Sequence, residues 1–151
     1  MKKASRIIVI ATTALLSAVT GCKDRNANDP AYLIEGQYQV SHYVVGNDTL
    51  ISPEKGNLSP YSNLSIEVRR KNDEMVTVYL KPTDNGGSQT TDGIYVKRDE
   101  SGIFRLTMPT NSINTDFGYA DGQNIFLNGA GWNPQDDQVF YTVIKGVKVS
   151  N

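Results

Sequence analysis

The chain is poor in the residues that build disulfide frameworks, metal centres and catalytic triads. Its 151 residues include one cysteine and one histidine. One cysteine excludes a disulfide within the chain and any metal site built from several cysteines, and a single histidine removes most imidazole chemistry. We therefore predict that the protein is not an enzyme and that it holds no cofactor and no metal ion. Its length fits one domain.

Long hydrophobic runs are also missing. The most apolar segment, Ile7 to Leu16, has 10 residues, whereas a membrane-spanning helix needs about 20. It follows the basic segment Met1 to Arg6 and precedes the small residues of Ser17 to Gly21. This order is the plan of a secretory signal peptide. Residues 1–21 are therefore predicted to be a removable leader whose apolar part is helical.

The leader ends in Val19-Thr20-Gly21-Cys22, which resembles the lipoprotein box of bacteria. The pattern of that family is an aliphatic residue, two small residues and a cysteine. The resemblance implies cleavage between Gly21 and Cys22, followed by acylation of Cys22 with chains such as palmitate. Several acyl chains anchor a protein stably, because each buried CH₂ contributes about 0.8 kcal/mol. Cys22 is thus the predicted lipidation site, and a membrane is the expected partner.

Residues 22–30 are predicted to form a lipidated tether. Lys23 to Asp29 is polar apart from one alanine, and Pro30 ends it. The pair Lys23-Asp24 has some similarity to the export signal of surface lipoproteins in the Bacteroidetes. We expect a lipid-anchored protein of the bacterial cell envelope, located in the outer membrane. Both the periplasmic face of that membrane and the cell surface are consistent with the sequence.

Neither sign of charge dominates the chain. It carries 15 basic and 16 acidic side chains, a formal net charge of −1. The leader holds three of the basic residues and no acid, so residues 22–151 carry a net charge of −4. A mildly acidic domain lacks the basic surface that nucleic acids require, so nucleic acid is not an expected partner.

Helical periodicity is absent from residues 31–151, and alternation of apolar and polar residues replaces it. The clearest hairpin pairs Leu64–Val68 with Val76–Leu80 around a polar tip. A last long strand, 139–149, is expected to bend at a bulge near Gly146. The other expected strands are 37–45, 49–51, 94–98, 104–108, 117–119 and 125–127.

These eight or nine strands predict an all-β domain over residues 31–151, built as an antiparallel up-and-down meander. Such a meander closes into a barrel or packs as a β-sandwich. A parallel βαβ architecture is excluded because no crossover helix is available. Consecutive pairing, and the removal of exposed sheet edges by closure, favour the barrel.

The first expected strand opens with Ile34-Glu35-Gly36-Gln37-Tyr38. This segment resembles the glycine-x-aromatic start of lipocalin-like and calycin-like domains, with Tyr38 where lipocalins usually have tryptophan. The resemblance covers Ile34–Val149 by strand order. It implies a closed barrel, often with a ligand cavity. Small lipoproteins of the Bacteroidetes often carry such a domain after the lipoprotein box.

His42 is the single imidazole of the chain. Strict alternation places it on the same strand face as Val40, either as a base inside a cavity or as a hydrogen-bonded histidine of the sheet. Asp48-Thr49-Leu50 resembles the acceptor of O-glycosylation in the Bacteroidetes, with Thr49 as the modified residue.

Trp132 lies in an expected loop, Asn128–Asp137, that is rich in glycine and asparagine. A large aromatic side chain in a loop either covers the core or contacts a ligand. Trp132 is therefore a possible ligand contact.

A strand meander without catalytic groups predicts a non-enzymatic binding module. Its ligand would be a small apolar molecule or a glycan. The alternative is a structural or interaction lipoprotein, such as an envelope accessory subunit or a hydrolase inhibitor, with no small-molecule ligand. A ligand cavity favours the first function, and a fully packed interior favours the second.

Overall fold

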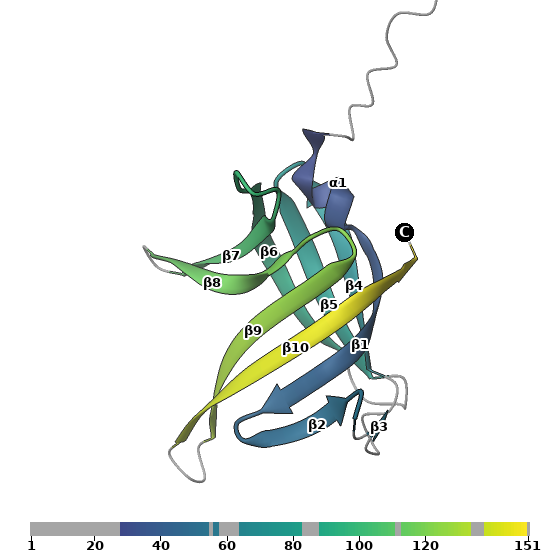
Figure 1. Ribbon diagram of the computed structural model, residues 1–151. Helices are drawn as coiled ribbons and strands as arrows, with labels where there is room; N and C mark the ends of the chain where they lie inside the picture. Colours follow the sequence, from purple (N-terminus) through teal and green to yellow (C-terminus); the bar gives the residue numbers. More distant parts are fainter. Residues whose placement is uncertain are drawn as a thin grey trace, which may run out of the picture.

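The computed structural model describes residues 28–54, 56–57, 64–82, 88–110, 113–133 and 138–150. The predicted leader, the cleavage site at Gly21 and Cys22, and nearly all of the tether lie outside the described residues. The described chain forms one short helix and ten strands (Figure 1). These are α1 (Pro30–Ile34), β1 (Gly36–Val45), β2 (Asp48–Ser52), β3 (Gly56–Asn57), β4 (Leu64–Asn72), β5 (Met75–Pro82), β6 (Gln89–Arg98), β7 (Phe104–Thr110), β8 (Ile113–Ala120), β9 (Asn124–Asn133) and β10 (Gln138–Ser150).

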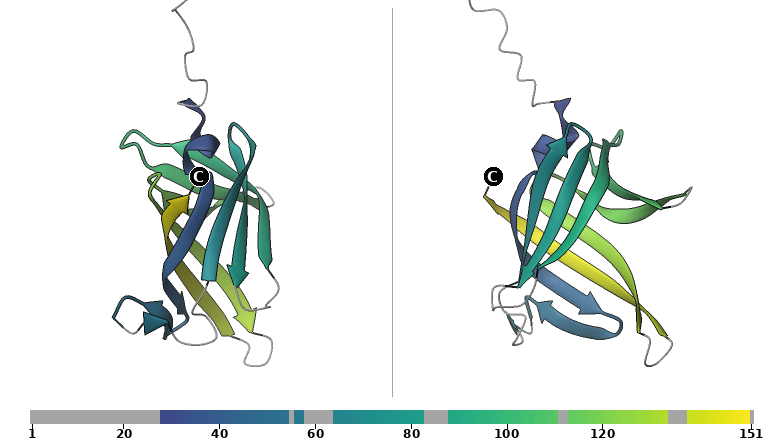
Figure 2. Two further views of the ribbon diagram at one scale, coloured as in Figure 1. Left: turned by 90° about the vertical axis from the view of Figure 1, so that its right-hand side faces the viewer. Right: turned by 180° about the vertical axis from the view of Figure 1, so that it is seen from behind.

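The strands form one antiparallel sheet that closes on itself. Its order is β10-β9-β8-β7-β6-β5-β4-β1-β2-β3, and β10 also pairs with β1. Eight strands, β1 and β4 to β10, therefore make a closed barrel (Figures 1 and 2). The predicted all-β antiparallel barrel is confirmed, and the sandwich alternative is not formed.

The barrel departs from a strict meander at β1. The first half of this strand, Gly36–Gln39, pairs with β4, while its last residues, Tyr43–Val45, pair with β2. β2 and β3 consequently lie outside the closed ring, at the end opposite α1 (Figure 1). We call the end covered by α1 the α1 end and the opposite one the far end.

A β-bulge shifts the register between β1 and β10. Val40 pairs with Gly146, but His42 pairs with Lys145, so Ser41 is the extra residue. The sequence predicted this irregularity near Gly146, and the structure places the inserted residue in the facing strand. One inserted residue exchanges the two faces of the strand beyond it.

Gly146 allows the strands to pack closely at the α1 end. A Cβ atom at this position would lie 3.0 Å from the Tyr38 Cβ and 3.2 Å from both Ile125 Cγ2 and Ile66 Cδ1. These distances are tighter than ordinary van der Waals contacts, so any side chain here would push the core apart.

The hydrophobic core lies inside the barrel. Its largest fully buried side chains include Tyr38, Ile66, Ile94, Leu106 and Ile125. Their strands supply alternate residues to the inside, as expected for a barrel. Among the residues whose burial the structure describes, the buried apolar side chains are Ala31, Ile34, Tyr38, Val40, Ile51, Leu64, Ile66, Val68, Val76, Val78, Ile94, Val96, Phe104, Leu106, Ala120, Ile125, Leu127 and Ile144.

Candidate binding sites at the two ends of the barrel

Helix α1 begins at a capped position that the periodicity of the sequence does not reveal. The Asp29 side chain accepts a hydrogen bond of 2.9 Å from the Tyr32 backbone N–H, and Pro30 occupies the first helical position. An N-cap aspartate followed by proline is a local signal for a helix start. This signal could have identified α1, which is too short to show helical periodicity.

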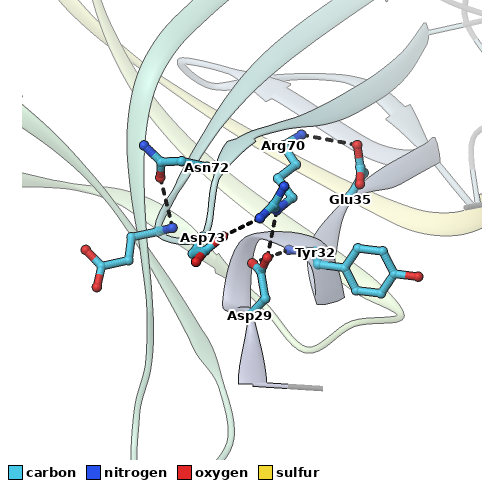
Figure 3. Close-up of polar contacts among 7 residues, drawn as sticks. Asp29, Tyr32, Glu35, Arg70, Asn72 and Asp73 are labelled. Atoms are coloured by element: carbon cyan, nitrogen blue, oxygen red, sulfur yellow. Dashed lines mark hydrogen bonds and ion pairs between the residues drawn. The ribbon is translucent and has the colours of Figure 1, made fainter. Parts of the chain in front are cut away.

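An ionic cluster fixes α1 to the β4–β5 turn (Figure 3). Arg70 Nε donates to Asp29 Oδ2 at 2.7 Å, and the same guanidinium pairs with Asp73. The Arg70 backbone N–H donates to Glu35 Oε1 at 3.3 Å. Asp29 is only 5% exposed, so its charge needs this partner. The cluster determines where the chain enters the barrel.

Tyr38 closes the α1 end from the inside. Its hydroxyl donates to the Ile34 carbonyl at 2.6 Å, which satisfies the end of α1. Burial raises the pKa of Tyr38 well above its usual range, and the charge of Asp121 adds to the effect. Lys148 Nζ lies 5.9 Å from the centre of the Tyr38 ring and 3.4 Å from the Leu33 carbonyl oxygen. No ligand can therefore enter the interior from this end without displacing these groups.

The glycine-x-aromatic segment thus has a structural role. Gly36 has φ of 142°, a conformation that favours glycine, where α1 gives way to β1. Tyr38, two residues later, is completely buried. The residues that carry the family resemblance are those that turn the chain and fill the α1 end.

The far end is less tightly covered. Two apolar side chains near it, Tyr43 and Leu80, pack against the core while remaining partly exposed. Met108 and Phe117 are partly exposed as well, but they belong to the β7–β8 hairpin, which projects from the side of the barrel (Figure 1). Tyr43 and Leu80 leave apolar surface accessible here, which makes the far end a candidate site for an apolar ligand.

A second candidate site is a hollow on the outside of the barrel beside α1. Its volume is about 500 Å³. Tyr32, which is 45% exposed, forms one wall. The lining residues are Tyr32, Glu35, Gly36, Gln37, Glu67, Val68 and Arg69.

Glu67 is the best-connected charged residue of this hollow. It accepts hydrogen bonds of 2.8 and 3.1 Å from Arg69 and also pairs with Lys81. The Arg69 bonds, followed by those of Lys81, lower the pKa of Glu67. The ring of Tyr79 lies between the two cations, 4.8 Å from the Arg69 guanidinium carbon and 5.7 Å from Lys81 Nζ. Glu67 is therefore an ionised acceptor held in place.

His42 does not face the interior, contrary to the sequence prediction. The Ser41 bulge reverses the alternation, so Tyr43 pairs with buried Ile144 while His42 pairs with exposed Lys145. Directly paired residues lie on the same face of a sheet. His42 thus belongs to the outer surface and cannot act as a base inside the barrel.

Trp132 lies in strand β9 opposite Val139, not in a loop as predicted. The pairing of β9 with β10 extends the strand through the glycine- and asparagine-rich segment, because a neighbouring strand outweighs local propensity. Its role as a ligand contact remains a prediction. Thr49 lies in β2 opposite Val44, and its glycosylation also remains a prediction.

Two features are absent from the described residues. They contain no cluster of histidine, cysteine, aspartate and glutamate that could hold a metal ion. They also contain no helix whose length and apolar character would suit a membrane span.

Comparison with known proteins bears on the fold. No protein-family model matches the sequence, and no curated protein matches it significantly. The chain is similar to a crystal structure of "a putative outer membrane protein" from Bacteroides fragilis, with a TM-score of 0.54 and 18% sequence identity. The match covers 80% of this chain and 53% of that protein, so the chain spans about half of its length. At this identity the likeness shows a shared fold.

Proposed function

We propose that this chain is a lipid-anchored, lipocalin-like protein of the bacterial outer membrane that binds a small apolar ligand without catalysis. The lipoprotein box at Val19–Cys22 supports the anchor. The similarity to the Bacteroides fragilis protein supports the location. The observation that carries the binding function is the difference between a filled α1 end and a far end with partly exposed apolar side chains.

The position of α1 would orient the protein on its membrane. Residues 23–28 separate Cys22 from the N-cap Asp29. Six residues reach at most about 20 Å. An acylated Cys22 would therefore hold the α1 end close to the membrane, and the far end would point away from it, accessible to a ligand in the surrounding compartment.

Two leucines allow a matched test of the binding function. Leu33 at the α1 end and Leu80 near the far end are both partly buried against the core. We expect Leu80→Asn to weaken the binding of a fluorescent fatty-acid analogue, because it places an amide on apolar ligand-facing surface. Leu33→Asn should retain the affinity of the unaltered chain.

The result that would overturn this function is an absence of saturable fatty-acid binding to the unaltered protein. Equal loss of affinity in both variants would also contradict a site at the far end. Thermal unfolding of both variants checks that each remains folded at the temperature of the titration.

The alternative function is an interaction lipoprotein without a small ligand. It is supported by apolar side chains on the outer surface, among them Tyr119 and Tyr141, which are 41% and 69% exposed. Tyr119 stacks on Phe126 with ring centres 4.9 Å apart. Exposed aromatic residues are typical of protein interfaces. Crosslinking in cells through these positions would favour this function if fatty-acid binding fails.

A further inference from the structure

We propose that the hollow beside α1 is a second binding site, which takes a neutral sugar. It lies on the outer surface beside α1, separate from the apolar surface at the far end. Its ligand class therefore does not depend on the apolar ligand proposed above.

The size and rigidity of the hollow suit a small ligand. Its volume of about 500 Å³ falls within the range of roughly 300–1,000 Å³ common for ligand sites. β1 and β4 form its floor through the pairs Gly36–Val68 and Gln37–Glu67. The ion pair between Asp29 and Arg70 holds α1 against that floor. A preformed site of this kind loses little entropy on binding.

The polar groups of the hollow include both hydrogen-bond donors and acceptors. Glu67 and Glu35 supply carboxylate oxygens, while Arg69 and Gln37 supply N–H donors. Tyr32 is exposed and Gln37 is partly exposed, so a ligand can reach both side chains. Each sugar hydroxyl both donates and accepts, so neighbouring hydroxyls match neighbouring acceptors and donors.

The charges of the hollow select a neutral ligand. Arg69 and Lys81 already pair with Glu67, so part of their positive charge is balanced before a ligand binds, while Arg69 keeps further N–H donors. Glu35 contributes a further carboxylate, which would repel an acidic ligand. The exposed ring of Tyr32 adds an apolar surface on which the C–H groups of a sugar ring can pack.

Such a sugar could be a free saccharide or the headgroup of a glycolipid. The hollow adjoins α1, through which the chain enters the barrel (Figure 1). If Cys22 is acylated as proposed above, the hollow lies near the membrane surface, where a headgroup could reach it. The two sources share the same chemistry at the site and require separate arms of one experiment.

The test uses the full acylated chain in phosphatidylcholine vesicles and saturation-transfer difference NMR. The probes are the methyl glycosides of glucose, galactose and mannose, with methyl glucuronide as the anionic comparison. We expect saturation of at least one neutral glycoside. Tyr32→Ala should weaken its binding about threefold or more, because one aromatic contact is lost. Tyr95→Ala is the matched control, since Tyr95 is 41% exposed on β6, away from the hollow.

Three outcomes would overturn the proposal: no saturation of any neutral glycoside, stronger binding of the glucuronide, or equal losses in the two tyrosine variants. In vesicles that also contain a galactolipid, competition with the free glycoside would identify a headgroup as the ligand. A lack of competition would identify the free saccharide, and either result supports a sugar site.

Fatty-acid binding by Tyr32→Ala separates this proposal from the proposed function. We expect that variant to bind the fatty-acid analogue as the unaltered chain does. If sugar binding fails while fatty-acid binding persists, the far-end site stands and the hollow is not a sugar site. If fatty-acid binding fails while sugar binding persists, the proposed apolar ligand is rejected and the sugar site stands.

Discussion

The two ends of the barrel differ in how fully their apolar side chains are buried. At the α1 end, a capped helical turn, a buried tyrosine hydroxyl and a glycine with no room for a side chain leave the interior filled. Towards the far end, Tyr43 and Leu80 keep part of their apolar surface exposed. The comparison indicates that the α1 end supplies stability, whereas the far end leaves apolar surface accessible.

The largest expected effect concerns attachment at the α1 end. Cys22→Ala should abolish labelling by an alkyne analogue of palmitate and move the protein out of the membrane fraction, because no acyl chain can form on alanine. Ser41→Ala, in the barrel, is the control and should retain both. Labelling of Cys22→Ala at the level of the unaltered chain would show that the anchor lies elsewhere.

A glycine pair tests the difference in packing. Gly146→Ala should lower the free energy of unfolding by about 2–3 kcal/mol, because the new Cβ overpacks the core. Gly129→Ala, on β9 beyond that core, is the control, since its Cβ would lie 3.6 Å from Thr142 Cβ, an ordinary contact. Urea denaturation measures both changes. Equal effects would contradict a tighter α1 end.

The buried tyrosine hydroxyl should have a smaller effect. Tyr38→Phe removes the donor to the Ile34 carbonyl and should cost about 1–2 kcal/mol, because a buried acceptor loses its partner. Tyr95→Phe, at an exposed site, should leave the free energy of unfolding unchanged. If the two variants have the same unfolding midpoint in urea, the hydroxyl does not stabilise α1.

The smallest effect is a loss of stability in acid that does not distinguish the ends. Hydrogen bonds from Lys71, and then from Thr77, lower the pKa of Asp92 to about 2, and Arg69 and Lys81 lower that of Glu67. A carboxylate with a lowered folded pKa stabilises the fold above its unfolded pKa of about 4 and loses this contribution as pH falls.

We therefore expect the urea midpoint to fall between about pH 4 and pH 2. Asp92→Asn should flatten this part of the profile, because it removes one titrating group. Ionic strength should matter as well, since both ion pairs lie at the surface. An unchanged acid profile in Asp92→Asn would show that this pair makes no contribution.

The sequence was sufficient to predict the fold class, because burial on one face of each strand leaves a visible period. The hairpin of Leu64–Val68 with Val76–Leu80 is formed as predicted. Strand lengths were harder to predict from the sequence. β9 continues to Asn133 through residues with low strand propensity, because its pairing with β10 outweighs the local preference of those residues.

The sites were harder to predict than the fold. The Ser41 bulge has no compositional signal, yet it decides that Tyr43 rather than His42 faces the core. The hollow depends on residues from α1, β1 and β4, whose proximity follows from barrel closure and the Asp29–Arg70 pair. A single sequence contains the residues of such a site without indicating that they meet.

The most direct test of the central claim locates the apolar ligand on the barrel. A spin-labelled fatty acid broadens the NMR signals of nearby groups, and the methyl groups of Leu80 and Leu33 report on the far end and the α1 end. We expect broadening of the Leu80 signals at ligand concentrations that leave those of Leu33 sharp. Broadening of Leu33 with Leu80 unaffected would contradict a site at the far end.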